Sequence, residues 1–343
     1  MSTIKDVAKY AGVSIATVSK YLNGGNVLDK NEKNINEAIE VLDYKVNLMA
    51  RGLKTNKTMT VGILIPSFVN IFFTTIVSNI ENILLQKGYS TIICDYREDE
   101  VLEQKKLEFL IKKNVDGIIM VPYGNISKQI QEILDQETPV VLLDRNMDNL
   151  DCDVVLTDNI NGSYDAVEQL IKRGHKRIGI ICGPEKIYTS QERLKGYHRV
   201  HEDYSIPIDK DLIKYGDYQT ESGHQKLIEL LNLKDPPTAV FVTNYEMTLG
   251  AIISINENNI NIPEELSIIG YDNIQMAKIV RPPLSIVTQP MQEIGETAAK
   301  TILQRLRGDM TNFPAIYRLK SDVLIKESVK NIDIQQKNDS PNI

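Results

Sequence analysis

Residues 4–23, IKDVAKYAGVSIATVSKYLN, predict two short helices joined by a tight turn. Thr3 and Asp6 have the spacing of a capping box, and Gly12 suits the turn after the first helix. Ser14 can cap the second helix. A third helix is predicted by apolar residues at the spacing i, i+3, i+4, i+7: Ile35, Ala38, Ile39 and Leu42. Three short helices of this kind, the first two joined by a tight turn, indicate a helix-turn-helix domain.

The outward face of the second helix is suited to the major groove of DNA. Ile15 can contact a thymine methyl group, the small Ala16 allows close approach, and Lys20 can reach guanine O6 and N7. Residues that can donate hydrogen bonds to phosphates surround this face: Thr3, Ser14, Thr17, Ser19 and Asn23. The alternative is a three-helix bundle with no role in DNA binding, because amphipathic helix pairs are common.

The distribution of charge supports a DNA-binding end on a larger body. The 343-residue chain carries a net charge of −7, which by itself argues against a nucleic-acid binder. Residues 1–60 nevertheless hold nine Lys/Arg and six Asp/Glu, so this segment is +3 and the remainder is −10. A mildly basic end on an acidic body fits a small DNA-binding module attached to a sensor, with chance fluctuation as the alternative.

From Thr60 onward, short apolar runs alternate with helical segments. Such runs imply parallel sheets covered by helices on both faces, so we expect an α/β fold after the all-α headpiece. The predicted strands are residues 60–65, 91–94, 117–121, 139–143, 154–157, 177–182, 239–243, 267–270 and 285–288.

Three of these runs have counterparts later in the chain, which suggests two similar doubly wound lobes. The pairs are TVGILIPS (60–67) with KRIGIICGP (176–184), DGIIMVPY (116–123) with TAVFVTNY (238–245), and PVVLLDR (139–145) with LSIIGYD (266–272). Buried parallel strands resemble one another in any protein, so duplication is one of two explanations.

The sequence lacks the motifs that several classes of protein require. Cys94, Cys152 and Cys182 form no metal-binding motif, and their odd number suits a reducing cytosol. The N-terminus has no signal-peptide pattern, and no apolar run approaches the ~20 residues that span a bilayer. There is no GxGxxG after a strand, no P-loop, no nucleophile elbow and no metal-ligand spacing of histidines. We therefore expect a cytoplasmic protein that is not an enzyme and uses no metal or cofactor.

The segment TIKDVAKYAGVSIATVSKYLNG, residues 3–24, closely resembles the start of the lactose/galactose-repressor (LacI/GalR) family of bacterial regulators. The resemblance extends to about residue 327 through further blocks in order: VGILIPSFVNIFF, VDGIIMVP, PVVLLDR, RGHKRIGII, ERLKGY, VFVTNYEMTLGA, IPEELSIIGYDN and RPPLSIVTQP. It implies a helix-turn-helix, a hinge helix and a core like that of periplasmic sugar-binding proteins. It also implies a homodimer, or a tetramer, on near-palindromic operator DNA.

The expected domains follow from these patterns and this resemblance. Residues 1–46 form the helix-turn-helix domain, residues 47–58 the hinge helix or linker, and residues 59–327 the effector-binding core. The core has two lobes of two segments each: an N-lobe of about 59–158 and 290–318, and a C-lobe of about 159–289 and 319–327. Residues 328–343 form a polar tail that is expected to be disordered, because it has too little apolar surface to offset chain entropy.

By the resemblance, Ile15, Ala16 and Lys20 occupy the base-reading positions. The hinge helix begins at Asn47 and ends at Leu53, whose side chain is expected to wedge open a central base step in the minor groove. Two residues depart from the family pattern. Lys20 replaces the usual Arg, which loses bidentate geometry and can alter base preference. Val46 replaces the usual Pro, which leaves the start of the hinge helix less defined.

Pyranose recognition needs aromatic faces for the ring and polar groups for its hydroxyls, and ligands of such sheets bind beyond the carboxyl ends of strands. By the resemblance, Phe72, Phe73 and Tyr218 sandwich the ring, and Asn70 adds a polar contact. The hydroxyls are bound by Asp144, Arg145, Arg193, Asn244, Asp272 and Gln289.

These effector-binding residues also have simpler interpretations. Phe72 and Phe73 can be core residues, Asp144 and Arg145 a solvated ion pair, and Gln289 a turn residue. Tyr245 departs from the family's usual Asp after the cleft Asn, which can reshape the pocket edge.

The resemblance implies that a sugar-like inducer changes lobe closure, which orders or melts the hinge segments and releases DNA. Two other functions are compatible with the same predicted cleft. A secreted sugar-binding transport component is disfavoured by the helix-turn-helix and the missing signal peptide. A regulator controlled by a partner protein is disfavoured by the complete set of sugar-type positions.

Overall fold

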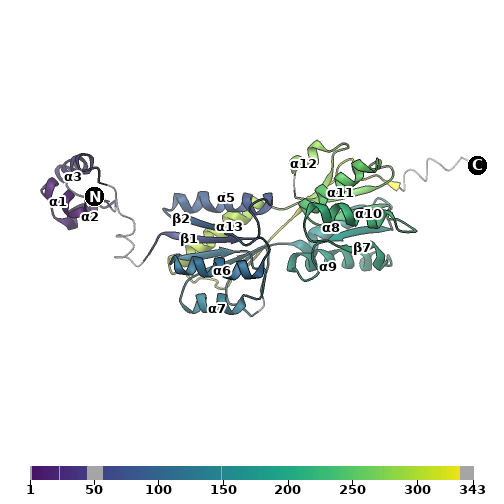
Figure 1. Ribbon diagram of the computed structural model, residues 1–343, viewed down its shortest axis with the longest axis horizontal. Helices are drawn as coiled ribbons and strands as arrows, with labels where there is room; N and C mark the ends of the chain where they lie inside the picture. The colour runs from purple at the N-terminus through teal and green to yellow at the C-terminus, as the bar shows by residue number, and fades with distance from the viewer. Residues whose placement is uncertain (1, 23, 45–56, 148, 273, 333–343) are drawn as a thin grey trace, which may run out of the picture. The chain divides into compact units, whose positions relative to one another are not determined.

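The computed structural model describes residues 2–22, 24–44, 57–147, 149–272 and 274–332 (Figure 1). The chain divides into two compact units, Met1–Thr58 and Met59–Ile343. The first unit is the headpiece, and the second contains two sheets, each at the centre of one lobe.

The headpiece consists of three helices, as predicted: α1 (Ile4–Ala11), α2 (Ile15–Leu22) and α3 (Asp29–Val41). The capping box is confirmed, because the N–H of Thr3 donates to Asp6 Oδ2 at 2.8 Å while Thr3 Oγ1 accepts from the N–H of Asp6. Gly12 ends α1 with φ of 66°, which a glycine adopts without strain. The three helices bury one apolar cluster: Val7, Ala8, Ala11, Val18, Ile35 and Ala38.

The N-lobe is built on a six-stranded parallel sheet in the order β11-β5-β4-β3-β1-β2. Its strands are β1 (Thr60–Ile65), β2 (Ser90–Asp95), β3 (Gly117–Met120), β4 (Val140–Leu143), β5 (Asp153–Thr157) and β11 (Ile316–Leu319). Two helices cover one face, α5 (Ile71–Gln86) and α13 (Met291–Leu306), and two cover the other, α6 (Glu100–Lys112) and α7 (Ser127–Asp135).

The C-lobe repeats this design with the order β12-β10-β9-β8-β6-β7. Its strands are β6 (Ile178–Cys182), β7 (Ile213–Tyr215), β8 (Ala239–Val242), β9 (Ser267–Tyr271), β10 (Ser285–Thr288) and the antiparallel β12 (Asp322–Leu324). One face carries α8 (Asn159–Ile171) and α9 (Tyr188–Asp203), and the other carries α10 (Thr220–Leu231), α11 (Tyr245–Glu257) and α12 (Ile274–Ile279). A short 3-10 helix, η1 (Lys210–Leu212), precedes β7.

The two sheets have the same strand order, and the sequence echo falls on equivalent strands. The three similar pairs of segments contain β1 and β6, β3 and β8, and β4 and β9, which hold matching positions in the two sheets. In each sheet the order reverses between the first and third strands, which is where such folds bind ligands.

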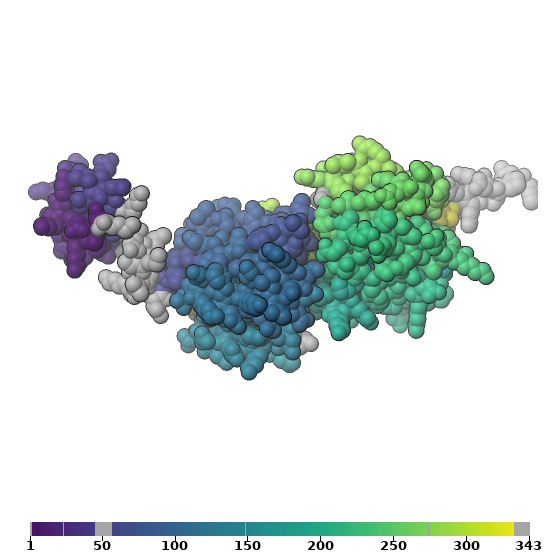
Figure 2. All heavy atoms as spheres, in the orientation of Figure 1, coloured from purple at the N-terminus to yellow at the C-terminus, as the bar shows by residue number. Residues whose placement is uncertain are grey.

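The lobes touch each other within this second unit. Tyr123 of the N-lobe packs against a C-lobe apolar cluster, and Tyr188 of the C-lobe packs against an N-lobe cluster. Figure 2 shows the blue atoms of the N-lobe and the green atoms of the C-lobe in contact.

The end of the chain corrects one prediction. Oγ of Ser328 donates to the carbonyl of Ile268 and accepts from the N–H of Ser285, each at 2.7 Å. Val329 is buried in the C-lobe core. The prediction that the tail is disordered from residue 328 onward is therefore wrong for residues 328–332, and residues 333–343 lie outside the described ones.

Candidate functional site

The outward face of α2 carries the residues predicted to read DNA. Ile15 is 45% exposed, and Ala16 and Lys20 are exposed as well. Ser14 lies at the start of the helix, where its Oγ accepts a hydrogen bond from the N–H of Thr17 at 3.1 Å. The helix thus presents a small-residue surface with one cationic side chain to solvent.

The other predicted DNA contacts are dispersed. Thr3 is the N-cap of α1, and Ser19 is partly buried on α2. Four residues that the predictions name lie outside the described residues: Asn23, Val46, Asn47 and Leu53.

The predicted effector residues of the core gather at the carboxyl ends of strands. In the N-lobe, Asn70 follows β1 and caps α5, accepting from the N–H of Phe72 at 2.9 Å, and Asp144 and Arg145 follow β4. In the C-lobe, four residues follow β7, β8, β9 and β10 in turn: Tyr218, Asn244, Asp272 and Gln289. Polar groups of both lobes therefore lie at the carboxyl ends of strands, where ligands of this fold bind.

The pKa values of these residues depend on charged groups from both lobes. Burial raises the pKa of Asp144, and the guanidinium groups of Arg145 and Arg193 partly offset that rise. Burial acts to lower the pKa of Arg193, but the net change is a rise because of the acidic groups around it: Tyr271, Tyr218, Asp272 and Asp144. Asp144 belongs to the N-lobe and Arg193 to the C-lobe, so one polar cluster spans both.

Asp272 is a carboxyl group of this cluster whose pKa lies near physiological pH. Burial raises its pKa to about 6, Arg193 and Gln289 partly offset the rise, and Asp144 adds to it. Nε2 of Gln289 donates to Oδ1 of Asp272 at 2.8 Å. The ionised carboxylate at pH 7 can accept hydrogen bonds from ligand hydroxyls, and protonation in mild acid removes part of that capacity.

Three buried polar atoms of the cluster have no hydrogen-bond partner among the residues that the structure describes. They are Oδ1 of Asp144, Nε of Arg145 and Oε1 of Gln289. Nε of Arg145 lies 3.7 Å from Oδ2 of Asp144, which is an ion pair without a hydrogen bond. A buried polar group left unpaired costs about 1–3 kcal/mol. These atoms therefore mark a place for a ligand that carries both donors and acceptors.

The backbone is strained at three of these positions. The φ angles of Asp144, Tyr218 and Asp272 are 62°, 67° and 71°, a left-handed conformation that L side chains rarely adopt. Such strain gathers at binding sites, because the surrounding structure must hold it in place. Gly183 leaves room for the Tyr218 ring, since a Cβ at Gly183 would lie 2.0 Å from Cζ of Tyr218.

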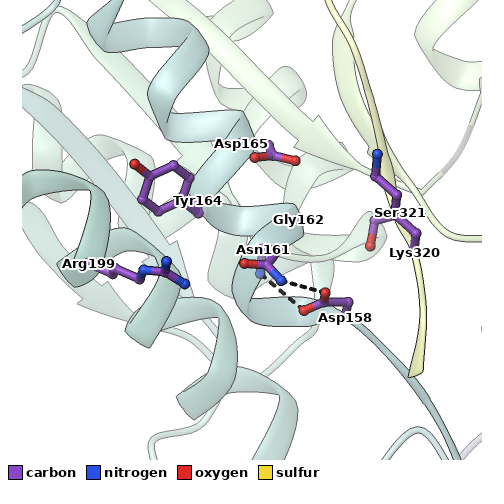
Figure 3. A pocket seen from close by; sticks show the side chains of 8 residues that line it. All are labelled: Asp158, Asn161, Gly162, Tyr164, Asp165, Arg199, Lys320 and Ser321. Atoms are coloured by element: carbon purple, nitrogen blue, oxygen red, sulfur yellow. Dashed lines mark hydrogen bonds between the residues drawn. The ribbon is translucent and has the colours of Figure 1, made fainter. Parts of the chain in front are cut away.

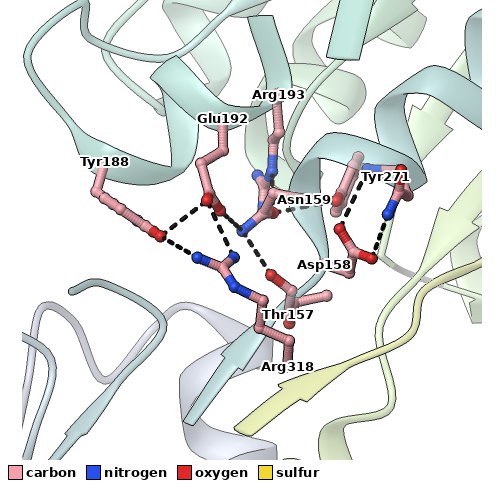
Figure 4. A network of polar contacts seen from close by, with 9 residues as sticks. Thr157, Asp158, Asn159, Tyr188, Glu192, Arg193, Tyr271 and Arg318 are labelled. Atoms are coloured by element: carbon pink, nitrogen blue, oxygen red, sulfur yellow. Dashed lines mark hydrogen bonds and ion pairs between the residues drawn. The ribbon is translucent and has the colours of Figure 1, made fainter. Parts of the chain in front are cut away.

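Arg193 is held in place by residues that sequence reasoning does not identify. Its Nε donates to Oδ1 of Asn159 at 2.8 Å, and its guanidinium carbon lies 4.1 Å from the centroid of the Tyr271 ring. Figure 4 shows Asn159 between Arg193 and Glu192, and Nδ2 of Asn159 donates to Glu192 at 3.4 Å. Asn159 and Glu192 carry no sequence signal of their own, because their roles arise only from tertiary contacts.

The aromatic candidates differ in their surroundings. Phe72 and Phe73 are buried in the N-lobe core, edge to face with ring centroids 5.1 Å apart. Core packing accounts for their burial, so their sugar-stacking role stays a prediction. The hydroxyl of Tyr218 lies 3.0 Å from Oγ1 of Thr189, a further buried residue that the sequence does not single out.

A separate hollow of about 420 Å³ lies where the chain crosses between the lobes (Figure 3). It is lined by polar residues of α8, α9 and the segment after β11, among them Asp158, Asn161, Asp165, Arg199 and Lys320. Its lining includes none of the predicted effector residues. The hollow is therefore distinct from the polar cluster.

The described residues form neither a candidate metal site nor a membrane-spanning helix. Within the described parts of the chain, no group of three or more His, Cys, Asp and Glu side chains is arranged to hold a metal ion. None of the described helices is long and apolar enough to cross a membrane. Cys94, Cys152 and Cys182 are buried free thiols.

Comparison with known proteins identifies the family. Residues 3–47 match the description "Bacterial regulatory proteins, lacI family", and residues 167–329 match "Periplasmic binding protein-like domain". The HTH-type transcriptional repressor PurR of Aliivibrio fischeri (strain MJ11) is 33% identical over 336 residues, which is 96% of this chain and 99% of that protein. The chain belongs to the LacI family.

Solved LacI-family structures share the fold over nearly the whole chain. The Lac repressor dimer bound to operator and the anti-inducer ONPF has a TM-score of 0.85 at 25% identity, covering 96% of this chain and 99% of that one. The transcriptional regulator CelR in complex with cellobiose has a TM-score of 0.73 at 27% identity, covering 96% and 100%.

Membership of the LacI family gives the headpiece and the core their general roles. The chain is a DNA-binding transcriptional regulator with an N-terminal helix-turn-helix and a ligand-binding core. The expected α/β fold with two lobes like those of periplasmic binding proteins is confirmed.

Proposed function

We propose that this regulator is a cytoplasmic, homodimeric repressor without enzymatic activity, and that a sugar bound between its lobes sets its affinity for operator DNA. The observation that carries the proposal is the buried polar cluster to which both lobes contribute. Its unpaired atoms on Asp144, Arg145 and Gln289 need the donors and acceptors that a polyhydroxylated ligand supplies. The CelR complex with cellobiose supports the ligand class, and the operator-bound Lac repressor dimer supports the assembly.

In this proposal α2 reads the operator. Ile15, Ala16 and Lys20 contact base edges in the major groove, since all three are exposed on one helix face. Thr3, Ser14, Thr17, Ser19 and Asn23 hold the backbone phosphates. Asn47 to Leu53 form the hinge helix, with Leu53 inserted at the centre of a near-palindromic site.

The sugar acts by binding one arrangement of the lobes better than another, because a ligand shifts a conformational equilibrium only through differential affinity. Asp144 and Arg193 come from different lobes and lie in the same cluster, so a sugar held by both favours contact between the lobes. We expect this shift to alter the hinge segments and to weaken operator binding, which makes the sugar an inducer.

The test combines thermal stability with DNA binding on the full chain. The purified protein is screened against mono- and disaccharides by thermal shift, because a specific ligand stabilises the folded state by mass action. Its operator is selected from random palindromic duplexes, and mobility shifts are recorded with and without the stabilising sugar. We expect one sugar to raise Tm and to weaken operator binding.

Two variants make this test specific. Asp144→Ala removes a carboxylate of the cluster and should abolish the sugar-induced shift in Tm. Asp151→Ala removes an exposed carboxylate of the same lobe and should leave that shift intact. If the selected palindrome binds no better than random DNA, the protein is not a sequence-specific regulator. If a sugar tightens operator binding, the sugar is not an inducer.

A further inference from the structure

The hollow where the chain crosses between the lobes has a polar lining that the proposed sugar site does not use. Its volume of about 420 Å³ lies within the range of small-molecule sites, about 300–1,000 Å³. We call this cavity the crossover hollow. Gly162 and Ser321 are its buried lining residues, and Oγ of Ser321 has no hydrogen-bond partner among the residues that the structure describes. A ligand in the crossover hollow would supply the partner that this buried hydroxyl lacks.

Two side chains of opposite charge face each other across the crossover hollow. Asp165 lies on α8, and Lys320 lies on the segment between β11 and β12 (Figure 3). Neither side chain forms a hydrogen bond or an ion pair with another residue in the described parts of the chain. Burial and the nearby Glu168 raise the pKa of Asp165, and Lys320 partly offsets that rise. A cationic group beside Asp165 would therefore stabilise its carboxylate.

The other two charged side chains of the lining already have partners within the protein. Oδ1 of Asp158 accepts from the N–H of Asn161 at 3.2 Å, and Oδ2 accepts from Nδ2 of the same residue at 2.6 Å. The guanidinium carbon of Arg199 lies 5.3 Å from the centroid of the Tyr164 ring, and its Nε lies 4.0 Å from Oδ2 of Asp203. The carboxylate and the ammonium that face each other are thus the charges that a ligand would meet.

We infer that the crossover hollow is a second ligand site, separate from the sugar site, and that it binds a small zwitterion of the α-amino-acid class. The ammonium group of the ligand binds the carboxylate of Asp165. Its carboxylate binds Lys320 and accepts a hydrogen bond from the buried hydroxyl of Ser321. Phosphate or sulfate suits the site less well, because the lining offers such an anion one unpartnered cation and places a carboxylate beside it.

The crossover hollow is placed to influence the arrangement of the lobes. Asp158 is the N-cap of α8, and the next residue, Asn159, accepts a hydrogen bond from Nε of Arg193 in the polar cluster at 2.8 Å. Lys320 lies on the connection from β11 of the N-lobe to β12 of the C-lobe. A ligand that joins this connection to α8 holds it in one position. Its binding therefore favours one arrangement of the lobes and changes the affinity for operator DNA.

The test is calorimetric titration of the full chain, without sugar, with each of the common L-amino acids. We expect at least one to bind. Asp165→Asn and Lys320→Gln should each weaken its binding at least about tenfold, because each removes a charge-assisted hydrogen bond. Asp211→Asn and Lys326→Gln change an exposed carboxylate and an exposed lysine of the same lobe, and these controls should leave binding unchanged. Thermal unfolding of each variant checks that it is folded.

Mobility shifts with the selected operator test the effect on DNA binding. We expect the saturating amino acid to change operator affinity at least about fivefold in the unsubstituted protein and to have no effect in Lys320→Gln. An unchanged affinity in the unsubstituted protein would show that the crossover hollow does not influence the lobes.

Three binding results would overturn the assigned site or its ligand class. If no amino acid binds, the crossover hollow is not a site for this class. If the matching amine without the carboxylate, or the matching acid without the ammonium, binds as tightly, the ligand is not recognised as a zwitterion. If Asp144→Ala abolishes binding while Asp165→Asn retains it, the amino acid occupies the polar cluster instead. Failure of every sugar to bind would contradict the proposed function alone, because the crossover hollow shares no lining residue with the sugar site.

Discussion

Arg318 and Glu192 join the two lobes, with Nη1 of Arg318 on β11 lying 3.0 Å from Oε1 of Glu192 on α9. Tyr188 completes the contact, since its hydroxyl donates to Glu192 at 2.8 Å and accepts from Arg318 at 3.0 Å. Glu192 also accepts from Asn159, which in turn accepts from Arg193 (Figure 4). A continuous polar network therefore connects the contact between the lobes to an arginine of the proposed sugar site.

Replacing Arg318 by Met should weaken the response to sugar. The Arg318 side chain is 44% exposed, so its direct attraction is worth only about 0–1 kcal/mol in water. Glu192 is only 6% exposed, so the substitution also leaves a buried carboxylate without its cation, which weakens the contact between the lobes further. We expect the sugar concentration that releases half of the operator to rise about three- to tenfold, as measured by titration of the operator complex.

Arg199→Met is the matched control for this prediction. Arg199 lies on the same helix as Glu192, but its ion pair with Asp203 stays within the C-lobe. The control should leave the half-release concentration unchanged. Equal effects of the two substitutions would show that contact between the lobes has no part in the response.

The sequence is sufficient to predict the central strands and the edge strand β2, but not the other three edge strands. Every predicted strand is present, with ends within one residue, because a buried parallel strand is a continuous apolar run. β7, β11 and β12 are missing from the prediction. They are short strands at the sheet edges, and β11 reads IYRL with alternating exposure, so no apolar run distinguishes them from a loop.

The residues of the candidate site also differ in whether the sequence is sufficient to predict them. Asp144 and Asp272 can be located from sequence because each directly follows a strand whose carboxyl end must face the cleft. Glu192, Asn159 and Thr189 cannot, because nothing local separates a buried polar residue at a helix start from an exposed one. The tail was mispredicted at Ser328 for a related reason: its burial depends on hydrogen bonds to distant strands.

Sugar binding should weaken in mild acid. Burial raises the pKa of Asp272 to about 6, so its carboxylate gains a proton as the pH falls from 7 to 5. We expect affinity to drop below pH 6 by up to about tenfold per pH unit. Calorimetric titrations from pH 5 to 8 measure this directly. Asp272→Asn should bind less tightly at pH 7 but show a flatter profile, and an equally steep profile in that variant would assign the effect to another group.

The same group makes an opposite contribution to stability. Its pKa in the folded state lies above the ordinary value of 3.8, so the folded protein binds the proton more tightly than the unfolded chain. Its stabilising contribution is present below about pH 4 and is lost as the pH rises through 6. We expect Tm of the sugar-free protein to fall relative to that of Asp272→Asn across this interval. Parallel Tm profiles would contradict the assigned pKa.

Lys20→Ala should reduce specific DNA binding more than non-specific binding. A lysine at a base edge contributes about 1–3 kcal/mol of discrimination, whereas a phosphate contact weakens all sequences alike. Competition titrations with the selected operator and with random DNA separate the two effects. Lys9→Ala removes an exposed charge from α1 and serves as the control. An equal loss on both DNAs for Lys20→Ala would place this side chain on the phosphates.

Arg305→Met should destabilise the N-lobe by about 3–5 kcal/mol, because it leaves the buried Asp153 carboxylate without its cation. The two side chains are 2% and 0% exposed and are joined by hydrogen bonds of 2.8 and 3.0 Å. Asp153 also accepts from the N–H of Ala315 at 2.9 Å, so the pair ties α13 to β5 and to the segment before β11. Urea unfolding measures the loss of stability, with Arg307→Met at an exposed position as the control.

Adding Asp153→Leu to Arg305→Met should restore part of the stability, since it removes the unpaired charge. A double variant no more stable than Arg305→Met alone would mean that packing, rather than the buried charge, sets the cost.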